Sequence, residues 1–100
     1  MIEVQPISFE EGTALAITVR LPKTTLLAVT TEKGYIMCGA LDVGLLNQRL
    51  AEREVLAGRA VGVKTIQELL DAPLESVTTT AEKAGIPAGI SGREAIRKMF

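Results

Sequence analysis

Histidine and tryptophan are absent from this chain of 100 residues, and cysteine occurs once, at Cys38. The lack of histidine excludes the Ser-His-Asp triad and the Cys-His pair of nucleophilic hydrolases. A zinc site is built mainly from histidine and cysteine, so we expect no metal. The chain has no Walker-type glycine loop and no EF-hand loop, and we expect no cofactor. One cysteine cannot form an internal disulfide, so nothing points to secretion.

An excess of charge of one sign is also lacking. The formal net charge is −1, whereas a domain that wraps nucleic acid needs a basic excess to neutralise phosphates. Single-stranded nucleic acid binds partly by stacking its bases on aromatic side chains. This chain has only three aromatic residues, Phe9, Tyr35 and Phe100. No apolar run approaches the ~18 residues of a membrane span, and the N-terminus lacks the basic start of a signal peptide. We therefore predict a cytoplasmic protein with no nucleic-acid or membrane partner.

The hydrophobic pattern predicts strands in the first part of the chain. Hydrophobic residues make up 47% of the sequence, and a chain of this length fits one domain, residues 1–100. Strand patterns at 2–9, 13–21, 24–31 and 35–41 are joined by short turns, which indicates an antiparallel meander. Pro6 cannot donate to a ladder, so the first strand is predicted to lie at an edge or to be bulged there. The fourth lies in the most apolar run, 34–42, and is predicted at the centre.

The predicted strand at 13–21 alternates with period 2, so its two faces differ. Leu15, Ile17, Val19 and Leu21 share one face, which we predict to be the core face. The opposite face carries small residues such as Ala14 and Ala16, and little charge, which would let a helix or another subunit approach. An exposed sheet face of this character invites a second subunit. We therefore predict a homo-oligomer that assembles through the N-terminal strands.

Helix patterns dominate the second part of the chain. Asp42 is a predicted N-cap of a helix that continues to about residue 53, and 55–63 and 74–77 are predicted strands. Capping boxes that begin at Thr65, Thr79 and Ser91 predict three further helices, and Gly85 a helix C-terminus. The predicted fold class is α+β. It has a mostly antiparallel N-terminal sheet of four to six strands, followed by three to four helices that pack on it.

Three blocks of sequence resemble one known family. They are GYIMCG at 34–39, GVKT at 62–65 and GIPAGISGREA at 85–95. In order and spacing they are similar to the YunC-like family, a bacterial and archaeal domain of unknown function, and the similarity covers nearly the whole chain. The resemblance implies an α/β fold of about this size and self-assembly through the N-terminal strands. It implies no established activity.

Cys38 is the first candidate for chemistry. It lies shortly before the predicted helix start at Asp42, and a helix N-terminus or a cation such as Lys64 or Arg93 would stabilise a thiolate. However, cysteine is also one of the most frequently buried residues, and Cys38 lies in an apolar strand. Both interpretations, a catalytic thiol and a core residue, stay open.

The second candidate is a site for an anion. The predicted helix starts at Thr65 and Ser91 each have a cation beside them, and helix N-termini present free N–H groups to anions. If these ends converge, they form a site from Lys64, Thr65, Ser91, Gly92 and Arg93, with Arg59 as an optional member. Alternatively, Thr65 and Ser91 only cap their helices and the cations are solvated.

Two classes of function follow from these candidates. The first is a small oligomeric, non-catalytic domain that binds a small anionic metabolite or has a structural role. The alternative is a cysteine-dependent enzyme or redox protein that uses Cys38. The sequence names no substrate for either class. The two classes differ in one testable respect: an enzyme needs the thiol of Cys38 to be accessible and ionised, whereas a non-catalytic domain does not.

Overall fold

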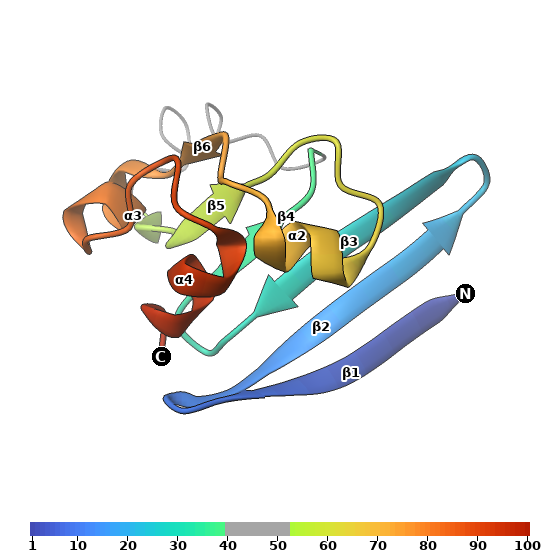
Figure 1. Cartoon of the computed structure of the whole chain (residues 1–100), viewed down its shortest axis with the longest axis horizontal. Coiled ribbons are helices and arrows are strands. Elements are labelled where there is room, and N and C mark those ends of the chain that lie inside the picture. The colour runs from blue at the N-terminus through green and yellow to red at the C-terminus, as the bar shows by residue number, and fades with distance from the viewer. Residues whose placement is uncertain (40–52) are drawn as a thin grey trace.

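The computed structural model describes residues 1–39 and 53–100, and its centre is a six-stranded sheet in the order β1-β2-β3-β4-β5-β6 (Figure 1). The strands are β1 (Ile2–Phe9), β2 (Gly12–Leu21), β3 (Thr24–Thr30), β4 (Tyr35–Met37), β5 (Ala57–Arg59) and β6 (Ser76–Val77). Neighbouring strands pair antiparallel, except that β4 and β5 are parallel. The prediction of β1 at an edge and of β4 inside the sheet is confirmed.

Three helices follow in the described part of the chain: α2 (Ile66–Asp71), α3 (Thr79–Lys83) and α4 (Gly92–Arg97). In Figure 1, α2 and α4 lie in front of the sheet, over β3 and β4, and α3 lies at the end near β5. The predicted α+β class is therefore confirmed. None of the helices in the described ranges is long and apolar enough to cross a membrane.

The helix starts follow the predicted capping residues in two of three cases. The side chains of Thr65 and Ser91 accept hydrogen bonds from the backbone N–H groups of Glu68, at 3.1 Å, and Glu94, at 3.2 Å. The prediction of Thr79 as the third cap is wrong by one residue, because Thr78 caps α3. Thr78 directly follows β6 and is buried, so its hydroxyl serves two elements at once. It accepts from the N–H of Ala81 at 3.2 Å and donates to the carbonyl of Val55 at 2.6 Å.

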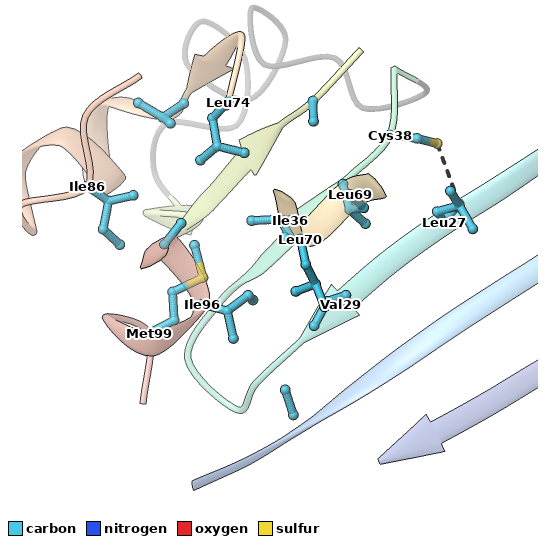
Figure 2. Packing of buried hydrophobic residues seen from close by; sticks show 14 of the residues in the cluster. Leu27, Val29, Ile36, Cys38, Leu69, Leu70, Leu74, Ile86, Ile96 and Met99 are labelled. Atoms are coloured by element: carbon cyan, nitrogen blue, oxygen red, sulfur yellow. Dashed lines mark hydrogen bonds between the residues drawn. The ribbon is translucent and has the colours of Figure 1, made fainter. Parts of the chain in front are cut away.

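The core lies between one face of the sheet and the helices (Figure 2). The sheet contributes small and branched aliphatic side chains, and the helices contribute leucine, isoleucine and methionine. The buried residues include Ala14, Ala16, Leu27, Val29 and Ile36 from the strands, and Leu69, Leu70, Ile96 and Met99 from the helices and the end of the chain. We call the sheet face that carries Ala14, Leu27 and Ile36 the inner face, and the opposite one the outer face.

The predicted core face of β2 is wrong. Ala14 and Ala16 are 0% and 2% exposed, whereas Leu15 and Leu21 are 44% and 47% exposed. The physical reason is that α2 packs over β2 and β3 on the alanine side, where small side chains let a helix approach closely. The large aliphatic residues of β2 therefore lie on the outer face, away from α2 and α4.

Four other predicted elements are shorter than expected or fall partly outside the described residues. The strand predicted at 55–63 is β5, which comprises Ala57–Arg59, and the one predicted at 74–77 is β6. Gly85 has a φ of 86° directly after α3 and forms the predicted helix end. The helix predicted from Asp42 and the last residues of the strand predicted at 35–41 lie largely in residues 40–52, outside the described ranges.

Candidate functional site

Cys38 lies in the core, directly after β4. Its side chain is 7% exposed and packs with the other buried aliphatic residues. The Sγ atom accepts a hydrogen bond from the backbone N–H of Leu27 at 3.5 Å, and the Cys38 N–H donates to the Leu27 carbonyl at 3.1 Å (Figure 2). The backbone and the thiol of Cys38 thus extend the hydrogen bonding between β4 and β3 by one residue. A thiolate nucleophile must be reached by its substrate, and this placement leaves little surface for one.

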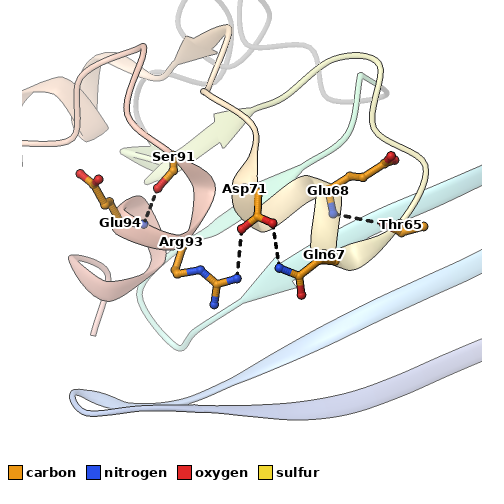
Figure 3. Close-up of polar contacts among 7 residues, drawn as sticks. All are labelled: Thr65, Gln67, Glu68, Asp71, Ser91, Arg93 and Glu94. Carbon is orange, nitrogen blue, oxygen red and sulfur yellow. Dashed lines mark hydrogen bonds and ion pairs between the residues drawn. The ribbon is translucent and has the colours of Figure 1, made fainter.

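The residues of the predicted anion site lie at two ends of α2. Thr65 caps the N-terminal end, with Lys64 beside it. At the other end the N–H of Gly92 donates to the carbonyl of Ala72 at 3.1 Å, which places Ser91, Gly92 and Arg93 there (Figure 3). The rise of an α-helix separates the two groups by about 10 Å. The structure therefore does not bring the five residues around one point.

Arg93 has a partner on α2. Its Nη2 atom lies 3.1 Å from Oδ1 of Asp71, and Gln67 donates to Oδ2 of the same carboxylate at 2.8 Å (Figure 3). The hydrogen bond from Gln67, and then that from Arg93, lower the pKa of Asp71 below its ordinary value. The charge of Arg93 is therefore already balanced by the end of α2.

Lys64 lines a hollow on the surface. Its backbone N–H donates to Oε1 of Glu68 at 2.6 Å, which completes the capping interaction of α2. The hollow has a volume of about 360 Å³ and lies between the β2–β3 turn and the loop before α2; it is lined by Lys23, Thr24, Thr25, Val63 and Lys64. Two lysines and no acidic side chain of the described residues line it, so its chemistry suits an anion.

Metal chemistry has no support in the described part of the chain. Within residues 1–39 and 53–100, no three histidine, cysteine or acidic side chains lie close enough together to hold a metal ion.

The most distinctive surface is the outer face of β1, β2 and β3, whose residues on β2 were predicted to form the core face. Strand register places Ile2 opposite Val19, and Val4 opposite Ile17, so these side chains share the outer face. Ile2 and Val4 are 69% and 57% exposed. The signal that could have revealed this face is the pair Ala14 and Ala16, because small residues mark the side on which a helix packs.

A mixed sheet with helices on its inner face and, over β1, β2 and β3, an outer face without charged residues defines a class of small α+β domain among the described residues. Within that class the chain belongs to the family of the domain of unknown function DUF1805, which matches residues 37–99. It is 61% identical over 100 residues to "Uncharacterized protein YunC" of Bacillus subtilis (strain 168), and the match covers 100% of this chain and 99% of that protein. The predicted YunC-like resemblance is therefore confirmed.

A solved structure is similar over the whole fold. It is the crystal structure of a protein of unknown function, TA1206, from Thermoplasma acidophilum, with a TM-score of 0.88 and 29% sequence identity. The similarity covers 100% of this chain and 94% of that one. The match to the DUF1805 domain begins only at β4, but both relatives extend over β1, β2 and β3 as well.

Proposed function

We propose that this chain is a self-assembling, non-catalytic cytoplasmic domain that contacts further copies of itself through the outer face of β1, β2 and β3. The observation that carries the proposal is the distribution of charge over these three strands. The outer face contains aliphatic side chains, one proline and small polar residues: Ile2, Val4, Pro6, Ser8, Thr13, Leu15, Ile17, Val19, Leu21, Thr24, Leu26, Ala28 and Thr30. None of these residues is charged.

The charged residues of the same strands lie on the inner face. Glu3 and Arg20 are the only ones in β1, β2 and β3, and they form an ion pair with each other. Both side chains are about half exposed, at 48% for Arg20 and 52% for Glu3. Charge is thus kept off the outer face of β1, β2 and β3, although aliphatic side chains such as Ile2 and Val4 are exposed there. Depletion of charge combined with exposed aliphatic side chains is typical of the centre of a protein interface.

The edge of β1 is less suited to assembly than its outer face. An edge strand of eight residues could pair with another strand through its free backbone groups. Pro6, in the middle of β1, has no N–H to donate and interrupts such a ladder. We therefore expect packing of sheet faces rather than addition of a strand.

Multi-angle light scattering tests the proposal. We expect the native chain to have a mass that is a multiple of its 10.7 kDa. Val4→Lys and Leu15→Lys place a charge on the outer face, where it would be desolvated in the assembly, and should shift the mass towards the monomer. Val61→Lys is the matched control, because Val61 is 47% exposed, like Leu21, but lies outside these strands.

The proposal fails if the native chain is monomeric at micromolar concentration, or if Val61→Lys dissociates it as readily as Val4→Lys does. Circular dichroism of each variant separates loss of assembly from loss of fold. A variant that unfolds is replaced by Ile2→Lys, at the exposed start of β1, where a lysine meets no core residue.

A second candidate function, binding of a small anionic metabolite, is favoured by the hollow at Lys23 and Lys64. These two lysines have no ion-pair partner among the described residues. A phosphate titration followed by amide chemical shifts tests this candidate. Saturable shifts at Lys23 and Lys64 that disappear in Lys64→Met, but persist in the Arg93→Gln control, would support it. Equal shifts in Lys64→Met would exclude it.

A further inference from the structure

One row of side chains crosses the outer face of the whole sheet. Strand register aligns Ala28 with Met37, Met37 with Arg59, and Arg59 with Ser76, on β3, β4, β5 and β6. The neighbouring residues Ile36, Gly58 and Val77 are buried against the core. Arg59 and Ser76 therefore lie side by side on the outer face, at the end of the sheet opposite to β1.

Both of these side chains contain a polar atom that is buried and lacks a hydrogen bond. Within the described ranges, the atoms in this condition are Nε of Arg59 and Oγ of Ser76. Buried polar side-chain atoms nearly always have a partner, because an unpaired donor loses its bond to water and gains nothing in return. The fact that two such atoms belong to directly paired residues on one sheet face indicates a common missing partner.

Arg59 differs in this respect from other arginines of the chain. Arg20, Arg93 and Arg97 each form an ion pair with a carboxylate, whereas no carboxylate of the described residues lies within ion-pair distance of Arg59. The adjacent acid, Glu75, is connected to Arg59 only through the backbone, since its N–H donates to the Arg59 carbonyl at 2.7 Å.

The guanidinium of Arg59 lies near Gly39, which has no side chain. A Cβ placed on Gly39 would lie 3.8 Å from Nη2 of Arg59 and 3.8 Å from Cγ1 of Val61. Gly39 therefore adds no side chain beside the guanidinium. Burial of the Nε atom strengthens the attraction between a guanidinium and an oxyanion. The side chain of Arg59 as a whole is only partly buried, although its Nε atom is buried.

We propose that Arg59 and Ser76 form a binding site for a small oxyanion, a carboxylate or a phosphate. The oxygens of the anion pair with the guanidinium and accept a hydrogen bond from the hydroxyl group of Ser76, so that both unbonded groups are satisfied. The site shares no residue with the hollow at Lys23 and Lys64, and it does not depend on self-assembly. It therefore goes beyond the proposed function.

The first experiment tests whether Arg59 lacks a partner within the chain. In phosphate-free buffer, Arg59→Met should keep or raise the melting temperature, because it removes an unpaired, partly buried charge. Arg93→Met is the matched control and should lower it, since Arg93 is paired with Asp71. A fall in Arg59→Met as large as that in Arg93→Met would overturn the proposal, because Arg59 would then be bound to an acid of the chain itself.

The second experiment measures binding directly with inorganic phosphate and with acetate, at constant ionic strength, by nuclear magnetic resonance. We expect saturable shifts of the Arg59 Nε–Hε signal and of the amides of Gly39 and Ser76. Affinity should fall by about tenfold or more in Arg59→Gln, fall less in Ser76→Ala, and stay unchanged in Lys83→Met, which replaces an exposed residue of α3. The stronger of the two probes identifies the class of anion. Chemical shift changes that do not saturate, or that are the same in Arg59→Gln as in the native chain, would overturn the proposal. If Arg59→Gln does not fold, an unchanged affinity in Ser76→Ala would overturn it instead.

Discussion

Arg97 and Glu11 are 86 positions apart in the sequence, and Nη2 of Arg97 lies 3.0 Å from Oε2 of Glu11. Nε of Arg97 also donates to both oxygens of this carboxylate, at 3.1 Å. The contact joins α4 to the turn between β1 and β2. Beside it the rings of Phe9 and Phe100 lie with their centroids 5.9 Å apart. The end of the chain therefore holds the N-terminal hairpin, whose outer face is the proposed assembly surface.

The Arg97–Glu11 contact predicts a dependence of stability on pH. The hydrogen bond from Arg97 lowers the pKa of Glu11 below its ordinary value. A carboxyl whose pKa is lower in the folded state stabilises the fold above its unfolded pKa, and this contribution disappears as the pH falls through the folded pKa. Glu11→Gln should therefore be less stable than the native chain near neutral pH, and the difference should vanish in acid.

Urea unfolding at a series of pH values measures this difference. Both side chains are exposed, so we expect a small effect, and Glu10→Gln is the control. Glu10 is 93% exposed and lies 3.9 Å from the guanidinium, and its replacement should change stability less. Equal stability of Glu11→Gln and the native chain near neutral pH would contradict the prediction.

The second prediction concerns the packing of α4 against α2 at Gly92. A Cβ at this position would lie 2.3 Å from the carbonyl oxygen of Leu69 and 2.7 Å from Cδ1 of Ile36. The first of these atoms belongs to the backbone of α2, so it cannot turn aside as a flexible side chain would. Gly92→Ala should force α4 away from α2 and lower the free energy of unfolding by about 1–3 kcal/mol or more.

Chemical denaturation of Gly92→Ala and Gly39→Ala checks this packing. Gly39 is the matched control, because a Cβ there meets its nearest neighbours at 3.8 Å. We expect Gly39→Ala to change the free energy of unfolding by no more than about 0.5 kcal/mol. Comparable losses in the two variants would show that the approach of α4 to α2 is not limited by Gly92.

The third prediction concerns the rate at which the thiol of Cys38 is alkylated. Because its side chain is 7% exposed and its sulfur accepts the Leu27 N–H, alkylation of the native chain should be slow and should become fast only on unfolding. The control is a Val61→Cys variant in a Cys38→Ala background, which carries its thiol at an exposed position and should react rapidly while folded. Rapid alkylation of native Cys38 would instead favour the alternative of a cysteine-dependent enzyme or redox protein.

The prediction from sequence succeeded where the cause of structure is local. Alternating side chains, turn residues and Pro6 gave the meander and its edge strand, and Thr65 and Ser91 marked two helix starts through bonds that span three residues. The third cap was predicted one residue too late, because the hydroxyl of Thr78 also serves residues Val55 and Ala57 of another part of the chain. That second role is a long-range contact, which a capping pattern does not contain.

By itself, then, the sequence determined the α+β class, the order of the strands along the chain and the fact that Ala14 and Leu15 point to opposite faces. Only the tertiary structure decided which of the two faces is covered. Period 2 separates the faces but carries no information on where α2 packs, and the close approach of α2 to the alanine side reversed the expected burial. Likewise, the spacing of Thr65 and Ser91 did not determine whether their helix ends meet, because that depends on how α2 and α4 pack against each other.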